Sequence, residues 1–129
     1  MLFQTCTEKI LLIDDEVDIL KFSESVLNEL GYEVTTADNS SNALANFKSD
    51  PSKFDLIITD QSMPNMSGIE LISEVLKIRP DMPIILCSGY SSKVSSDNAS
   101  EKGISKYIDK PYSKEILSEA IRGVLDKHL

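Results

Sequence analysis

Short apolar runs alternate along the chain with segments in which apolar residues recur every three or four positions. The segment KILLI at 9–13 is a continuous apolar run, as expected of a strand buried on both faces of a sheet. Four more segments have strand-like composition, at 32–37, 54–60, 82–88 and 105–109. Helical spacing and stop signals predict helices at 17–30, from Ser40 or Ser41 to before Pro51, from 69 to before Pro80, at 91–102, and from Ser113 to near 127. This alternation predicts an α/β fold in which five helices cover both faces of a five-stranded parallel sheet.

The predicted helices differ in how well they are anchored to a core. Apolar residues recur at helical spacing in the helix at 17–30, at Ile19, Phe22, Val26 and Leu30. The last helix carries apolar residues in adjacent pairs four residues apart, at Ile116, Leu117, Ala120, Ile121, Val124 and Leu125. The segment 91–102 offers only Val94 and Ala99, so we expect a short and mobile helix there.

Composition restricts the class of protein. The chain has 129 residues, of which 41% are hydrophobic and 26% charged, so it fits one folded domain. A net charge of −8 argues against a nucleic-acid surface, which needs clustered Lys and Arg.

No stretch approaches the roughly 18 apolar residues of a membrane span, and the first residues do not resemble a signal peptide, so no membrane insertion is expected. Cys6 and Cys87 make no disulfide framework, which favours the cytoplasm. Residues 1–8 lack periodicity and are interpreted as a tail before a domain at 9–129.

Polar side chains follow four of the predicted strands. Asp14 and Asp15 follow the first strand, Asp60 ends the third, Ser88 ends the fourth and Lys110 follows the fifth. Each is ordinary alone, because acids, Ser-Gly turns and lysines are common after strands. In a parallel sheet, however, the carboxyl ends of the strands meet at one edge, where open α/β sheets bind ligands. We therefore expect these five residues to form one site.

This set of groups indicates phosphoryl chemistry. Three carboxylates within about 4 to 6 Å of one another repel by several kcal/mol per pair, so a cation is expected among them. Oxygen ligands that are open to water suit Mg²⁺. Lys110 adds a second positive charge, and the Ser88 hydroxyl adds a hydrogen bond to a phosphoryl oxygen. A metal, an ammonium and a hydroxyl around Asp60 favour phosphoryl transfer to that carboxylate.

The sequence resembles the receiver domains of two-component response regulators. The resemblance runs from about Lys9 to Leu129, with its motifs in the family's order: LLIDDE, LIITDQSMPNMSGIEL, ILCSGY and KYIDKP. It implies a flavodoxin-like fold with strand order 2-1-3-4-5. It also implies that 9–129 is a receiver (response regulatory) domain.

The resemblance further implies roles for individual residues. Asp60 is expected to accept a phosphoryl group from a histidine kinase or a histidine phosphotransfer domain. Asp15, Asp60 and the backbone carbonyl of Ser62 are expected to bind Mg²⁺ (or Mn²⁺) directly, with Asp14 helping through water. Lys110 is expected to bind the phosphoryl group.

Two more positions match the family's conformational switch. Ser88 takes the place of the switch Ser/Thr, and Tyr107 that of the switch aromatic, although a half-buried strand aromatic is the simpler interpretation of Tyr107. A signal is expected at the face built from 91–102, the fifth strand and the last helix. The family also implies a cis peptide bond at Lys110-Pro111, whereas X-Pro bonds in general are mostly trans.

Other functions are possible for such a chain. A small Mg²⁺-dependent phosphohydrolase would be expected to have D-x-D after its first strand and a substrate-binding cap. A pseudo-receiver would have the same fold without phosphorylation, and a dinucleotide-binding domain would have G-x-G-x-x-G after the first strand. We expect a signalling domain, not an enzyme, with slow loss of its own phosphoryl group. Its output partner is a separate protein or other domains of the same chain, as in a hybrid histidine kinase.

Overall fold

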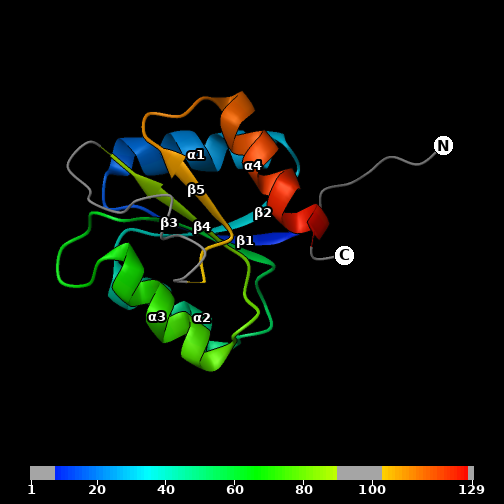
Figure 1. Ribbon diagram of the computed structural model, residues 1–129. Coiled ribbons are helices and arrows are strands. Elements are labelled where there is room, and N and C mark those ends of the chain that lie inside the picture. The colour runs from blue at the N-terminus through cyan, green and yellow to red at the C-terminus, as the bar shows by residue number, and fades with distance from the viewer. Residues whose placement is uncertain (1–7, 90–102, 128–129) are drawn as a thin grey trace.

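The protein folds around a five-stranded parallel β-sheet. The computed structural model describes residues 8–89 and 103–127 (Figure 1). The strands are β1 (Lys9–Ile13), β2 (Glu33–Ala37), β3 (Leu56–Asp60), β4 (Ile84–Ser88) and β5 (Lys106–Asp109). All four strand pairs are parallel, and the strand order is β2-β1-β3-β4-β5, as the resemblance implied.

Four helices lie within the described residues, and they cover both faces of the sheet. They are α1 (Val17–Glu29), α2 (Ser40–Ser49), α3 (Gly68–Ile78) and α4 (Lys114–Lys127). In Figure 1, α1 and α4 lie above the sheet and α2 and α3 lie below it. Each described element agrees with its predicted range to within two residues. The helix predicted at 91–102 lies outside the described residues.

Two hydrophobic cores result from this layering. One joins the sheet to α1 and α4 and includes Leu27, Ile85 and Ile121. The other joins it to α2 and α3 and includes Phe47, Ile57 and Ile72. All five residues of β3 and of β4 are buried, because these central strands have neighbours on both sides and helices on both faces. The two central strands therefore hold their terminal residues in fixed positions.

The predicted apolar stripe of α1 is wrong in part. Phe22 is 46% exposed, whereas Leu20, Ser23, Val26 and Leu27 are buried. Positions 20, 23 and 27 also recur at helical spacing, and the helix is rotated so that its two leucines face the sheet. A similar difference occurs in α4, where Ile116 is 50% exposed although its paired neighbour Leu117 is buried.

The helix caps hold the loops at the carboxyl edge of the sheet. Ser67 forms a capping box with Glu70 at the start of α3, and Ser113 caps α4 as predicted, accepting from the Ile116 N–H at 3.1 Å. The predicted serine cap of α2 is wrong. Asn39 is the cap instead, because its side chain accepts from the Asn42 N–H at 2.8 Å.

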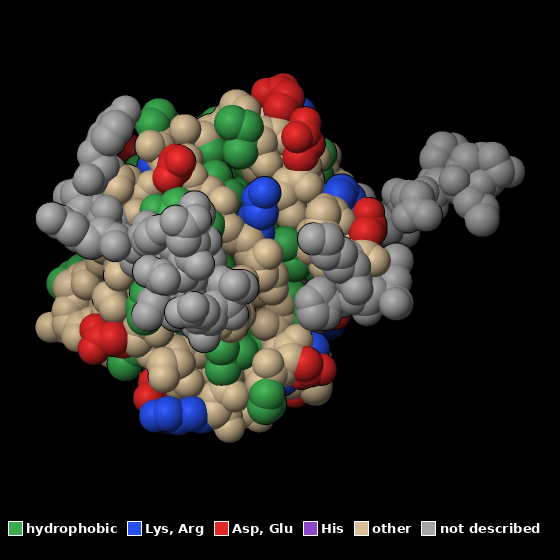
Figure 2. Space-filling view, in the orientation of Figure 1, with side chains coloured by type: hydrophobic (Ala, Val, Ile, Leu, Met, Phe, Trp, Pro, Cys, Tyr) green, Lys and Arg blue, Asp and Glu red, His purple; other side chains and the backbone are tan. Residues whose placement is uncertain are grey.

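The Lys110-Pro111 peptide bond is cis, as the resemblance implied. On the face shown in Figure 2, acidic and basic side chains of the described residues are interspersed. None of the helices at 8–89 and 103–127 is long and apolar enough to cross a membrane.

Candidate functional site

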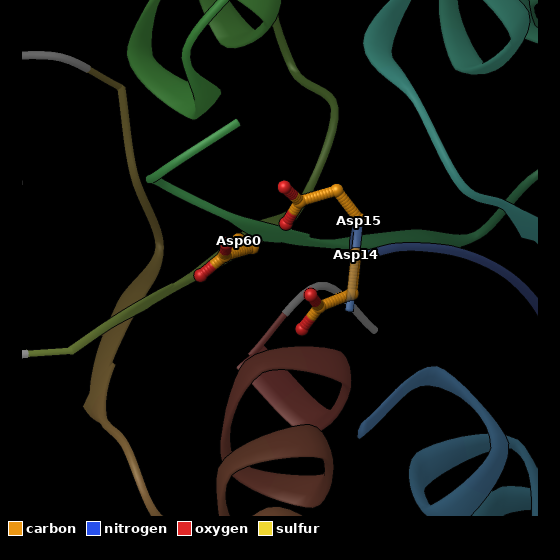
Figure 3. A group of neighbouring side chains, drawn as sticks. All are labelled: Asp14, Asp15 and Asp60. Carbon is orange, nitrogen blue, oxygen red and sulfur yellow. The ribbon is translucent and has the colours of Figure 1, made fainter. Parts of the chain in front are cut away.

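Three carboxylates converge where β1 and β3 end. Asp14 and Asp15 directly follow β1, and Asp60 is the last residue of β3. Each offers an oxygen atom, and these atoms all lie within 4.8 Å of one another. Figure 3 shows the side chains of Asp14 and Asp15 directed toward that of Asp60. The predicted convergence of the three acids is therefore present in the fold.

Lys110 joins two of these carboxylates. Its ammonium nitrogen lies 2.9 Å from Asp14 Oδ2 and 2.9 Å from Asp60 Oδ1. Its backbone N–H donates to the Ser88 carbonyl at 2.8 Å, which fixes the start of the loop after β5 against the end of β4. Only 10% of the lysine side chain is exposed, so both ion pairs are shielded from water. One buried ammonium thus offsets part of the charge of three acids.

The single positive charge of Lys110 does not balance the negative charges of the three carboxylates. Burial raises the pKa of Asp60, and the charges of Asp14 and Asp15 raise it further, although the hydrogen bond from Lys110 opposes this. Burial alone would lower the pKa of Lys110, but its hydrogen bonds to Asp14 and Asp60 outweigh that effect and raise its pKa. Lys110 therefore stays charged, while ionised Asp60 is stabilised less than an exposed aspartate.

An unsatisfied oxygen indicates where a cation would bind. Asp15 Oδ1 is buried and has no hydrogen-bond partner among the described residues. Such an atom costs free energy unless a cation or a donor satisfies it. It belongs to the same group of three carboxylates, whose hard oxygen atoms suit Mg²⁺. The residues present therefore fit a divalent metal ion.

Comparison with known proteins identifies the family. The family model for the response regulator receiver domain matches residues 10–122. The chain belongs to this family. It is thus a signalling domain of the kind found in two-component response regulators.

Known proteins are similar to this receiver over most of its length. It is 38% identical over 116 residues to the DNA-binding transcriptional regulator NtrC of Azospirillum brasilense, covering 89% of this chain and 24% of that protein. It is 31% identical over 118 residues to the response regulator receiver protein CpdR of Brucella abortus (strain 2308), covering 92% and 97%. A crystal structure of a response regulator receiver domain protein from Clostridium thermocellum matches with TM-score 0.85 at 35% identity, covering 94% and 96%. The chain spans about a quarter of the length of several curated relatives, such as 26% of the transcriptional regulatory protein GlrR of Escherichia coli (strain K12).

The two predicted serines of the receiver lie at the same edge but not in equivalent surroundings. Ser88 is 1% exposed, and its hydroxyl donates to the Gly89 carbonyl at 3.4 Å, so its hydrogen bond is local. Ser62 lies in the loop two residues after Asp60, and its side chain is exposed. The roles of both serines remain predictions.

Tyr107 lies on β5, paired with Leu86 of β4. Its side chain is partly buried and packs against the core shared with α2 and α3. It also lines a groove of about 530 Å³ between β5 and α4. The simpler interpretation of Tyr107, a half-buried strand aromatic, agrees with this position, and its switch role remains a prediction.

Sequence reasoning missed two contacts that shape the receiver's site. A Cβ at Gly68 would overlap the Asp60 carbonyl oxygen, and the Gly68 N–H donates to the Gln61 carbonyl at 3.0 Å. Tyr112 follows Lys110 by two residues, and its hydroxyl lies 2.7 Å from Ser23 Oγ on α1. The glycine after a Pro/Asn/Ser turn was a signal for close packing. No local pattern pairs residues that are 89 positions apart.

Proposed function

We propose that this receiver accepts a phosphoryl group on Asp60 from the phosphohistidine of a histidine kinase or a histidine phosphotransfer domain. The observation that supports it is the position of Asp60, 3% exposed at the end of β3, with Lys110 and two more carboxylates around it. A strand that is buried along its length holds this carboxylate rigidly, and rigid positioning supplies much of the catalysis in phosphoryl transfer.

The reaction moves one phosphoryl group between two side chains. An Asp60 carboxylate oxygen attacks phosphorus, the new P–O bond forms an acyl phosphate, and the P–N bond to the donor imidazole breaks. The imidazole nitrogen keeps the electron pair and leaves as a neutral or protonated ring. Lys110, which is hydrogen-bonded to Asp60 before transfer, stabilises the negative charge on the transferred group.

Mg²⁺ (or Mn²⁺) is the expected cofactor. Asp14, Asp15 and Asp60, with the backbone carbonyl of Ser62, would hold it, and the buried, unsatisfied Asp15 Oδ1 supports this assignment. When bound, such an ion neutralises charge on the carboxylates and on the phosphoryl oxygens. Asp14 has less capacity for the ion, because its two oxygens already accept from Glu16 N–H and from Lys110. This agrees with a role for Asp14 through water.

Phosphorylation is expected to be read at the face of β5 and α4. A phosphoryl group on Asp60 would attract the Ser88 hydroxyl and Lys110, and movement of Ser88 would open space for Tyr107. Tyr107 and the half-exposed Ile116 line the groove on this face, so a partner could sense the change there. The partner is a downstream protein or other domains of the same chain. Slow loss of the phosphoryl group is the only hydrolysis that we expect.

The experiment is phosphorylation by a small phosphodonor. The protein is incubated with Mg²⁺ and an acyl phosphate or phosphoramidate, and its intact mass is measured. We expect a gain of one phosphoryl group that requires Mg²⁺ and disappears in Asp60→Asn. Asp55→Asn is the matched control, because Asp55 lies at the opposite end of the sheet, and this variant should still be modified. A wild-type protein that gains no mass, or a gain that survives Asp60→Asn, would contradict the proposal.

A further inference from the structure

One partly buried hydrogen bond joins the loop that carries Lys110 to the helix that follows the two acids. The Tyr112 hydroxyl and Ser23 Oγ lie 2.7 Å apart. Ser23 is 1% exposed, and the Tyr112 ring packs against the core between α1 and α4. A buried serine within an otherwise apolar stripe is costly unless its hydroxyl is satisfied, and Tyr112 satisfies it.

This contact acts on both sides of the candidate site. Along the chain, Tyr112 lies two residues after Lys110 and directly before Ser113, which caps α4. Ser23 lies on α1, which begins two residues after Asp15. The Tyr112–Ser23 hydrogen bond therefore connects the segment that presents the ammonium with the segment that presents Asp14 and Asp15.

Lys110 itself joins the two segments, because its ammonium lies 2.9 Å from Asp14 and 3.8 Å from Glu16, but the other contacts near the site are weak. A cleft of about 440 Å³ separates the first half of α1 from the loop, and Ile19, Phe22, Pro111 and Tyr112 line it. Apolar packing therefore does not close this region. The ion pair between Lys114 and Glu29 lies on the surface, with side chains 41% and 62% exposed, and such pairs contribute little. Among the described residues, the hydroxyl pair is thus the main polar contact between α1 and the loop besides the ion pairs of Lys110 itself.

We propose that Tyr112 is a positioning residue for Lys110, and that it acts through its hydrogen bond to Ser23. The bond holds the loop against α1 so that the Lys110 ammonium stays within reach of both Asp14 and Asp60. This inference rests on the proposed function for its consequence in phosphoryl transfer. Its structural part concerns the unphosphorylated protein alone.

The test compares Tyr112→Phe, Ser23→Ala and the double variant with the wild type. The first readout is the side-chain ammonium signal of Lys110 in a ¹⁵N-lysine sample, assigned by its loss in Lys110→Arg. We expect the hydrogen-bonded, slowly exchanging signal of the wild type to broaden or vanish in all three variants. The second readout is the rate of Mg²⁺-dependent phosphorylation by a small phosphodonor. We expect it to fall about threefold to tenfold, because small misplacements at such sites cost up to about a hundredfold.

The double variant separates positioning from stability. Tyr112→Phe leaves the buried Ser23 hydroxyl unpaired, and Ser23→Ala leaves the partly buried Tyr112 hydroxyl unpaired. The double variant replaces both partners by apolar groups and should recover much of the lost stability to urea. Positioning requires that its Lys110 signal and phosphorylation rate stay impaired. Tyr32→Phe is the matched control. Tyr32 is also buried, and its hydroxyl accepts at 3.2 Å from Arg122 of α4, away from the acids. It should change stability but neither site readout.

Two outcomes would overturn the inference. One is recovery of the Lys110 signal and the rate in the double variant, which would make the hydrogen bond merely structural. The other is an equal loss of both readouts in Tyr32→Phe. If the wild type takes no phosphoryl group, the proposed function fails, and the Lys110 signal alone still decides the positioning role.

Discussion

The two ends of the β-sheet use charged groups in opposite ways. Where the strands begin, charged side chains have close partners. The Asp55 carboxylate accepts from the backbone N–H of Lys9 at 2.8 Å, and the Arg122 guanidinium lies 3.2 Å from the Glu8 carboxylate. Arg79 donates from the same end to the Phe54 carbonyl at 2.7 Å. Where β1 and β3 end, three carboxylates lie together, one buried ammonium pairs with two of them, and an oxygen of the third has no partner among the described residues.

This difference indicates that the charges at the carboxyl ends serve binding more than stability. An excess of buried negative charge costs stability and is retained where a cation or a new anion binds. Matched substitutions at the two ends should therefore have different effects.

The largest effect is expected from removal of the shared ammonium. Lys110→Met keeps most of the aliphatic stem but leaves Asp14 and Asp60 buried without their cation. Breaking a buried ion pair by removing one partner costs about 3 kcal/mol or more of unfolding free energy. Urea unfolding without metal should show this loss, and excess Mg²⁺ should restore part of it.

Lys9→Met is the control for Lys110→Met at the opposite end. Lys9 Nζ lies 3.8 Å from Glu33, and both side chains are largely exposed, so the loss should stay below about 1 kcal/mol. Equal losses of unfolding free energy in the two variants would show that the Lys110 ammonium stabilises the fold no more than the Lys9 ammonium does.

Packing at the site should also tolerate less change than packing elsewhere. In Gly68→Ala the new Cβ would overlap the Asp60 carbonyl oxygen and lie 2.8 Å from Leu86 Cδ1, so the backbone must shift. We expect a loss of about 2 kcal/mol, within the range for overpacked cores, and slower phosphorylation of Asp60. Gly123→Ala in α4 meets nothing within 4 Å and should gain about 0.5 to 1 kcal/mol from helix propensity. Thermal unfolding of both variants measures the difference, and a neutral Gly68→Ala would contradict the close approach.

Sequence reasoning predicted the sheet and its ends well, for a physical reason. Strands such as 9–13 and 82–88 are buried on both faces, so their composition alone distinguishes them. Parallel strands also bring their carboxyl ends together whatever the helices do, which placed Asp14, Asp15, Asp60 and Lys110 correctly in one site. The strand order was implied by the family resemblance and not by periodicity.

The rest depends on how helices are oriented on the sheet. A helix such as α1 has more than one stripe with helical spacing, and only packing against the sheet selects Leu20 and Leu27 over Phe22. The choice of Asn39 as the cap of α2 depends on local backbone geometry, while Ser40 is buried and donates to the Met66 carbonyl at 2.7 Å. The Tyr112–Ser23 hydrogen bond requires the relative position of two elements, which no local pattern contains.

A smaller effect of opposite sign is expected at Asp60 itself. Asp60→Asn removes one of three crowded carboxylates, so without metal it should raise the free energy of unfolding by on the order of 1 kcal/mol. Asp55→Asn, at the other end, removes a charge whose oxygen accepts from Lys9 N–H and should be neutral or slightly destabilising. Excess Mg²⁺ should stabilise the wild type more than Asp60→Asn and so reduce the difference. Urea unfolding with and without Mg²⁺ tests this, and a destabilised Asp60→Asn in metal-free buffer would contradict it.

The pH dependence of stability isolates the contribution of Asp60, and it is the smallest effect. The folded-state pKa of Asp60 is raised above 3.8, mainly by burial and then by Asp14 and Asp15. Above pH 3.8 the unfolded chain releases this proton before the folded protein does, so this contribution makes stability fall as pH rises through the folded pKa. The raised pKa of Lys110 acts elsewhere: its stabilisation is complete below 10.5 and is lost only at higher pH. The wild-type unfolding free energy minus that of Asp60→Asn should therefore decrease from pH 4 to 7 in metal-free buffer. A difference that increases with pH would mean that Lys110 outweighs the burial of Asp60 and the repulsion from the other two acids.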